Sequence, residues 1–195
     1  MASKVEICNS ALNMLGANNI IDITEDSKNA RLLNQRYEPV RDAVFRTHAW
    51  NCLIKRVELA ADTQTPSHEY TYQYTLPSDC LRVLKVGGHH DGSSSDLDNG
   101  TAFKVEGRKI LSDESTMNLI YISKITDVNE YDTLLQETLA ARLAYELCYA
   151  ITSSTSLAQQ MNELYQEKLR EARHVDASEG TADKLDSSTF INSRY

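Results

Sequence analysis

The stretch RDAVFRTHAWNCLIKRVELA (residues 41–60) contains the change of pattern that decides the fold. Its first part continues a helical spacing of apolar residues through Val44, whereas from Lys55 onward apolar and polar residues alternate, as at Val57 and Leu59. Side chains on a helix repeat about every 3.6 residues and those on a strand every 2. The sequence therefore predicts that a helix ends here and that a β region begins.

The stretch YTYQYTLPSDCLRVLKV (residues 70–86) continues the alternation, and further alternating segments follow. We expect one small antiparallel sheet over about residues 55–125. The row formed by Tyr70, Tyr72 and Tyr74 lies on one side of a strand. There it belongs either to the core or to a surface patch that another protein covers, so the three tyrosines are candidate partner-binding residues.

Helical periodicity predicts a bundle of four helices into which the sheet is inserted, so the expected fold class is α+β. The predicted helices span residues 3–15, 25–48, 132–152 and 156–175. The third is expected to be central because leucines recur every four positions along it. Pro39 predicts a kink or a short break in the second helix. We treat residues 1–175 as a single domain.

The last helix is expected to bury one apolar stripe along its length. The stripe consists of Leu157, Met161, Leu164, Lys168, Ala172 and Val175. The remaining face is long and charged, which is typical of a solvated or subunit-facing helix.

Two segments lack any periodicity. The stretch GGHHDGSSSDLDNG (residues 87–100) has almost no apolar residues, so a mobile loop at the tip of a hairpin is predicted. Residues 176–195 are predicted to be a flexible C-terminal tail. The apolar end of this tail provides further candidate partner-binding residues, namely Phe190, Ile191 and Tyr195.

Composition restricts the possible functions. The chain has 195 residues with 20 basic and 28 acidic side chains, a formal net charge of −8, which disfavours a protein whose main task is to grip phosphate. No signal peptide and no apolar run of about 20 residues are expected, so we predict no membrane insertion. The four cysteines lie far apart inside apolar segments, which indicates reduced, packed thiols made in a reducing cytoplasm.

No motif predicts a catalytic residue, a cofactor or a metal site. His89, His90 and Asp91 are metal-ligand types, but adjacent histidines in a glycine-flanked loop lack the spaced partners that close a site. Asp91, Ser93 and Ser95 match an adhesion-site pattern that needs a parallel α/β sheet, which is not expected here. The sequence also lacks a G-x-S-x-G elbow, a phosphate-binding glycine loop and an H-E-x-x-H helix.

Four further side chains have both a structural and an interface interpretation. Trp50, the only tryptophan, is expected to pack as a clamp, and the competing role is an interface anchor. Arg36, Arg41 and Arg46 recur every five residues, so they spread around a helix and predict separate salt bridges, with Glu38 and Asp42 as candidate partners.

The order of these blocks resembles the tail tubular protein A family of short-tailed bacteriophages. The resemblance rests on residues 41–60 and 70–86, on ICNSALNMLGANNIIDITEDSKNARLLNQRYEPVRDAV (residues 7–44), and on LLQETLAARLAYEL (residues 134–147). It covers most of the chain up to about Gly180. The segment 87–100 has a composition specific to this chain and cannot be aligned with the family. The segment 176–195 has too few distinctive residues to be aligned with it residue by residue.

The resemblance implies a structural virion protein and not an enzyme, namely a head-to-tail adaptor in the tail or neck. It implies a homo-oligomeric ring, expected to be a dodecamer, between the portal protein and the tail nozzle protein. DNA would pass through the ring without sequence-specific binding. Two alternatives remain open: a virion-associated polysaccharide hydrolase, which needs two carboxylates on facing elements, and an unrelated cytosolic binding module.

Overall fold

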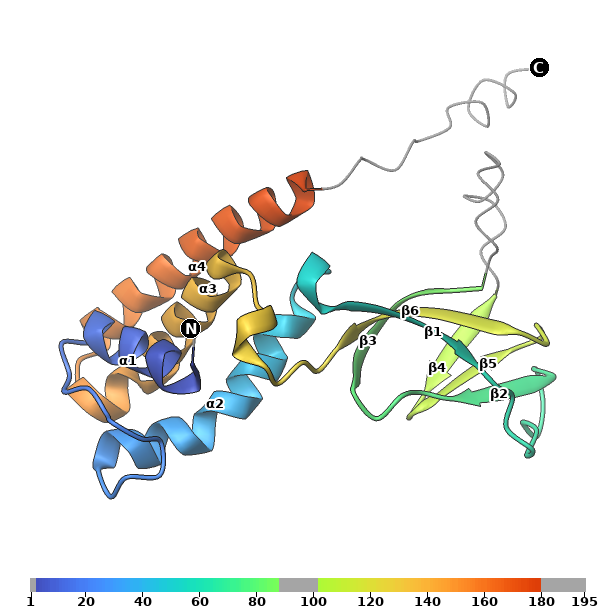
Figure 1. Cartoon of the computed structure of the whole chain (residues 1–195), viewed down its shortest axis with the longest axis horizontal. Helices are drawn as coiled ribbons and strands as arrows, with labels where there is room; N and C mark the ends of the chain where they lie inside the picture. The colour runs from blue at the N-terminus through green and yellow to red at the C-terminus, as the bar shows by residue number, and fades with distance from the viewer. Residues whose placement is uncertain (1–2, 88–101, 180–195) are drawn as a thin grey trace, which may run out of the picture. The chain divides into compact units, whose positions relative to one another are not determined.

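The computed structural model describes residues 3–87 and 102–179, and it confirms the α+β class (Figure 1). The helices in this part of the chain are α1 (Lys4–Met14), α2 (Lys28–Arg46), α3 (Thr133–Thr152) and α4 (Thr155–Ser178), with short 3-10 helices at Asn51–Leu53 and Val128–Glu130. The strands are β1 (Ile54–Leu59), β2 (Tyr72–Thr75), β3 (Cys80–Val86), β4 (Phe103–Glu106), β5 (Lys109–Ser112) and β6 (Met117–Ser123). The four helices therefore lie close to their predicted ranges.

The predicted domain of residues 1–175 is divided in the structure into two compact units. The helical unit contains residues 3–53 and 124–179, and the sheet unit contains residues 54–87 and 102–123. The division follows from the sequence, because the change from helical to alternating periodicity coincides with the first residue of β1.

The helical unit is built around α3, which packs against α1, α2 and α4 (Figure 1). Asp132 caps its first turn by accepting hydrogen bonds from the backbone amides of Leu134 (2.9 Å) and Leu135 (3.4 Å). The leucines at its four-residue repeat are almost fully buried, as expected of a helix covered on several sides. Ser153 ends α3 in the left-handed conformation, with φ of 56°.

The outer helices begin and end largely as their sequences predict. The Ser3 side chain accepts from the Glu6 amide (3.1 Å) and the Glu6 carboxylate accepts from the Ser3 amide (2.7 Å), which completes a capping box for α1. Gly16 follows α1 with φ of +64°, a conformation that glycine adopts without strain. The expected break at Pro39 is absent, because α2 runs without interruption from Lys28 to Arg46 with Pro39 exposed inside it.

Helix α4 does not bury the predicted apolar stripe. Its buried residues are Tyr165, Leu169, Ala172 and Asp176. At 100° per residue this line is rotated by about 70° from the predicted stripe. As a result Leu157, Met161 and Leu164 are only half-buried and Val175 is exposed. Of the predicted stripe only Ala172 is buried, and the helix makes its core contact along the neighbouring line that contains Tyr165 and Leu169.

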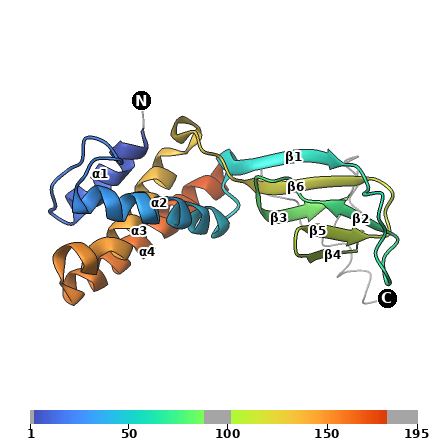
Figure 2. The same ribbon diagram turned by 90° about the horizontal axis from the view of Figure 1, so that it is seen from below.

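The sheet unit contains two three-stranded antiparallel sheets, which corrects the expectation of one small sheet. The first has the order β1-β6-β3 and the second the order β2-β5-β4, as Figure 2 shows. Neighbouring strands β2 and β3 belong to different sheets because the chain turns at Pro77 between them. Each sheet thereby turns an apolar face toward the other, which a single small sheet cannot do.

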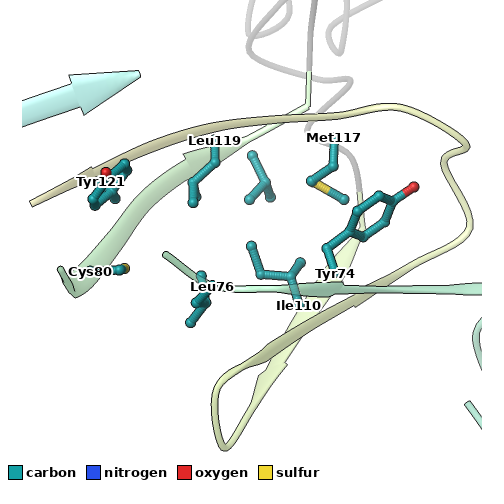
Figure 3. Packing of buried hydrophobic residues seen from close by; sticks show 8 residues of the cluster. Tyr74, Leu76, Cys80, Ile110, Met117, Leu119 and Tyr121 are labelled. Carbon is teal, nitrogen blue, oxygen red and sulfur yellow. The ribbon is translucent and has the colours of Figure 1, made fainter. Parts of the chain in front are cut away.

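A shared hydrophobic core lies between the two sheets (Figure 3). Met117, Leu119 and Tyr121 of β6 face Tyr74 of β2 and Ile110 of β5. All five side chains are buried, and burial of large apolar side chains contributes roughly 1.5–3 kcal/mol each before entropy is counted. This core holds the second sheet in place through β2 and β5, and β4 is attached to it by pairing with β5.

The segment 87–100 was expected at the tip of a hairpin, and the topology contradicts this. The strands on either side of it, β3 and β4, lie in different sheets, so it connects the two sheets instead. Its expected mobility, and the predicted flexible tail of residues 176–195 beyond Glu179, fall outside the described residues. The part of that tail up to Ser178 belongs to α4.

The tryptophan and two of the arginines form the structural contacts that the sequence favoured. Trp50 is fully buried, and its indole Nε1 donates to the Val44 carbonyl over 3.2 Å. Arg41 is buried and paired with Asp42 at 2.7 Å. Arg36 pairs with Glu146 of α3 at 2.9 Å, a partner that sequence proximity did not indicate.

Candidate interaction sites

The connection between α1 and α2 presents a fully exposed isoleucine on a fixed backbone. The Asn9 side chain donates to the Ile20 carbonyl and accepts from the Ile20 amide, both over 2.9 Å. These bonds hold Ile20 in the core, with 3% of its surface exposed, while Ile21 is 93% exposed. The same bonds fix the backbone next to Ile21, whose side chain is left outside the core.

A second set of hydrogen bonds fixes the part of the α1–α2 connection that follows Ile20. The Glu25 carboxylate accepts from the amides of Ile21 (2.9 Å) and Asp22 (3.4 Å). The hydrogen bond from the Ile21 amide is the main cause that lowers the pKa of Glu25. The Thr24 hydroxyl and amide likewise lower the pKa of Asp22. The carboxylates are therefore ionised at neutral pH, and Ile21 stands beside two negative charges.

An exposed tyrosine lies at the same end of the helical unit. Tyr149, near the end of α3, is 63% exposed. The Lys28 ammonium at the start of α2 donates to the Ala150 carbonyl over 2.6 Å, so the end of α3 lies beside the start of α2. Ile21 and Tyr149 define what we call the apolar end of the helical unit.

Sequence reasoning missed both residues of the apolar end. The signal for Ile21 was the doublet Ile20–Ile21 in a polar connection, where only one of two neighbours can enter the core. Tyr149 stands one position beyond the buried Cys148, and helical spacing alone places it away from the core face.

The tyrosine row is divided between core and surface. Tyr74 is fully buried and its hydroxyl donates to the Glu114 carbonyl, so it is a core residue and not part of a partner-binding surface. Tyr72 is half-buried against the same core. Tyr70, also half-buried, precedes β2, because Glu69 adopts φ of 71° and interrupts the extended backbone.

The sheet unit carries a polar hollow of about 310 Å³. Its lining residues are Pro66, Ser67, His68, Glu69, Gln73, Lys104, Glu106, Lys109 and Leu111. Both lysines already have anionic partners, because Lys104 lies 3.0 Å from Glu106 and Lys109 contacts Asp62. The Lys109 ammonium also donates to the Thr75 hydroxyl. With its cations neutralised, the hollow has no excess positive charge for a phosphate or a carboxylate.

The buried carboxylate of Asp176 is the centre of a polar cluster in the helical unit. Asp176 accepts from the Asn51 amide over 3.0 Å, and its other oxygen lies 3.1 Å from His48 Nε2. The Asn51 side chain also donates to the Asp176 carbonyl over 2.7 Å. Nearby Cys52 makes the cluster resemble a nucleophile site, but burial raises the pKa of the Cys52 thiol, which disfavours the reactive thiolate. The cluster therefore fits a structural role in fixing the end of α4.

The remaining residues that the sequence analysis considered, whether as candidate sites or as rejected ones, fall outside the described residues. These are Phe190, Ile191 and Tyr195 of the tail, and the polar residues His89, His90, Asp91, Ser93 and Ser95. Within residues 3–87 and 102–179, no group of three or more histidine, cysteine or acidic side chains is placed to hold a metal ion. In the same residues no helix has the length and apolar content needed to cross a membrane.

Neither a protein-family model nor a curated protein matches this chain.

Proposed function

We propose that this protein is a structural virion component, a head-to-tail adaptor similar to the tail tubular protein A family. In this role copies of the chain form a ring, expected to be a dodecamer, between the portal protein and the tail nozzle protein. The order of sequence blocks from residue 7 to residue 147 supports the proposal, as does the α+β fold with a helical unit and a sheet unit. Such a protein acts mechanically and catalyses no reaction, and its assembly is stabilised by the surfaces that are buried between subunits and partners.

The observation that carries the proposal is the apolar end of the helical unit. Leaving Ile21 93% exposed forgoes the burial energy of a large side chain, roughly 1.5–3 kcal/mol. The Asn9 side chain, which donates to and accepts from Ile20, and the Glu25 carboxylate, which accepts from the Ile21 amide, nevertheless hold the backbone that presents it. A preorganised apolar contact loses little entropy on binding, which is what a subunit of a large assembly requires.

Charge is consistent with a conduit for DNA. The formal net charge of −8 disfavours tight binding to the phosphate backbone, and a channel through which DNA slides must not hold it. The polar hollow agrees with this, since Lys104 and Lys109 are already neutralised by Glu106 and Asp62.

The C-terminal residues are the proposed contact with the portal or with an adjacent subunit. The segment from Lys184 to Tyr195 contains Phe190, Ile191 and Tyr195 and falls outside the residues that the structure describes. Deleting it is expected to leave the free energy of unfolding unchanged and to abolish attachment to the portal. Unchanged attachment would remove this role from the tail.

The alternative as a polysaccharide hydrolase receives less support. Its general acid is a carboxyl group whose pKa is raised so that it keeps its proton near neutral pH. In the described residues, the carboxylates with a displaced pKa are Asp22, Glu25, Asp62 and Asp127, and all four are shifted downward by hydrogen bonds.

The proposal is tested by light scattering of the purified protein, alone and mixed with the portal protein encoded nearest to its gene. We expect a complex with one adaptor per portal subunit. Ile21→Ser is expected to keep the melting temperature and to weaken the complex, whereas the matched control Ile21→Val retains an apolar contact and keeps it. A wild-type protein that stays small and ignores the portal contradicts the proposal and favours a cytosolic binding module.

A further inference from the structure

Strand β4 leaves one edge of its sheet without a neighbouring strand in the described part of the chain. It lies at the rim of the order β2-β5-β4, as Figure 2 shows, and pairs only with β5. The other rim strand, β2, is partly covered, because the Asp62 amide donates to the Gln73 carbonyl over 2.9 Å. The four residues of β4 are all exposed.

The turn after β4 determines which backbone groups face this edge. Gly107 and Arg108 form a two-residue hairpin turn between Glu106 and Lys109, and Gly107 has φ of +58°, as a type II′ turn requires. In such a hairpin the two residues that flank the turn, Glu106 and Lys109, form backbone hydrogen bonds with each other. Along β4 every second residue then bonds to β5, and the residues between them direct their amides and carbonyls to the other side. The amides and carbonyls of Phe103 and Val105 therefore point away from β5, toward the free edge.

The side chains of the same two residues extend the apolar core face beyond its cover. Val105 stands beside Ile110 and Tyr74 in one row across the sheet, and these two neighbours are fully buried (Figure 3). Val105 itself is 43% exposed, and Phe103 is 39% exposed. An open backbone edge thus coincides with an uncovered apolar strip.

The opposite face of β4 carries one charge of each sign. Lys104 and Glu106 lie 3.0 Å apart and are each more than half exposed. They stand on either side of Val105 in the sequence. If the strand is paired antiparallel with a copy of itself, centred on Val105, the order of the two charges is reversed in the second strand.

We propose that two copies of this chain pair through their β4 edges, antiparallel and about a two-fold axis at Val105. Each Val105 then lies opposite its counterpart and exchanges both backbone hydrogen bonds with it. Lys104 of each copy lies opposite Glu106 of the second copy, which forms two cross-strand ion pairs. The two sheets join into one of six strands.

The same register also accommodates Phe103, the largest side chain of β4. Phe103 falls opposite Gly107 of the second copy, and no atom lies within 4 Å of the position where a Cβ on Gly107 would stand. A phenyl ring can therefore cover the glycine backbone, an arrangement known to stabilise cross-strand pairs. A strand with only apolar side chains would leave Lys104 and Glu106 without partners across the edge, so the charge pattern favours a second copy.

This pairing does not depend on the proposed function. A two-fold contact is closed and ends at the dimer, whereas a ring is built from head-to-tail contacts. The dimer is therefore a state of the free protein, in which the edges that promote aggregation are paired.

The first experiment is sedimentation velocity of the full chain over a series of concentrations. The wild type is expected to pass from monomer to dimer as its concentration rises. Val105→Pro is expected to stay monomeric, because it removes an amide that points to the free edge and leaves the bonds between β4 and β5 intact. The matched control Val105→Thr keeps the amide and a β-branched side chain, so it is expected to dimerise.

A charge exchange tests the register itself and does not rely on proline. Lys104→Glu or Glu106→Lys alone places like charges opposite each other twice, which should raise the dimer dissociation constant about tenfold. The double variant Lys104→Glu/Glu106→Lys restores both pairs and should restore dimerisation.

The pairing would be overturned by a monomer at every concentration, by a dimer that Val105→Pro leaves intact, or by a double variant that dimerises no better than the single ones. A larger assembly that is insensitive to all these variants would also overturn it while leaving the adaptor proposal standing. An intact dimer without portal binding contradicts the adaptor proposal alone.

Discussion

His48 Nε2 lies 3.1 Å from Oδ2 of Asp176, a contact that joins the segment after α2 to the last turns of α4 across 128 positions of sequence. The same carboxylate accepts from the Asn51 amide over 3.0 Å. Asp176 is buried, so each of these bonds replaces water that the carboxylate lost on folding. The chain end of the helical unit is thereby fixed immediately before residues 180–195.

Asp176→Ala is expected to lower the free energy of unfolding by about 2–3 kcal/mol, because it removes the buried carboxylate that accepts from the Asn51 amide. Urea denaturation measures this change. The matched control is Asp26→Ala, which removes an exposed pair with Arg31 and should change stability by less than about 0.5 kcal/mol. Equal effects of the two substitutions would show that the cluster does not anchor α4.

Asn9→Ala removes both hydrogen bonds that hold Ile20, so amides near Ile20 and Ile21 should exchange with solvent faster. Hydrogen exchange read by mass spectrometry reports this, and we expect a stability loss of about 1–2 kcal/mol. Asn13→Ala is the control, because Asn13 is exposed on the same helix. If exchange is unaltered in Asn9→Ala, the presentation of Ile21 does not depend on this clamp.

Pro39→Ala is expected to stabilise the helical unit by about 1–3 kcal/mol, since alanine restores the amide that proline lacks in the middle of α2. The proline is exposed, so its replacement costs no core packing. Thermal and urea unfolding measure the gain, with Glu38→Ala at the neighbouring exposed position as the control. A loss of stability would mean that Pro39 makes a contact that outweighs the missing hydrogen bond.

The protein is expected to lose stability in alkali between about pH 10 and pH 12. Burial raises the pKa of Tyr121 and of Tyr131 to about 12, from an unfolded value of 10. A raised pKa means that the folded state keeps protons which the unfolded state releases. The stabilisation is thus complete below pH 10 and is lost as the pH rises through 12.

Unfolding followed at several pH values, with tyrosinate absorbance recorded in parallel, measures this dependence. Tyr121→Phe removes one of the two titrating groups and should flatten the alkaline limb. A difference in tyrosinate absorbance between the wild type and Tyr121→Phe that rises near pH 10, before the protein unfolds, would contradict the shielding of Tyr121.

Much of the helical unit could be predicted because its signals are local. The capping box of Ser3 and Glu6, the stop at Gly16 and the leucine repeat of α3 all depend on residues within a few positions of one another. Pro39 does not interrupt α2, because packing of α2 against α3 compensates for one absent hydrogen bond.

The candidate sites were harder to predict from the sequence than the helices. Tyr72 and Tyr74 share one face of a strand, and alternation cannot tell whether a second sheet covers that face. The exposure of Ile21 follows from Asn9, which bonds to Ile20 from eleven positions away. The doublet Ile20–Ile21 indicates locally that one of the two isoleucines is exposed, but the distant bond to Asn9 decides which one.

The sequence by itself determined the helices, the change to strands at β1 and the α+β class, because hydrophobic period and capping residues act within a few turns of chain. Only the tertiary structure decided how six short strands divide into two sheets, which face of α4 enters the core, and where β4 leaves an edge open. These outcomes depend on pairings between distant segments. Many such pairings satisfy the same alternation, and the packing energy of the whole unit selects among them.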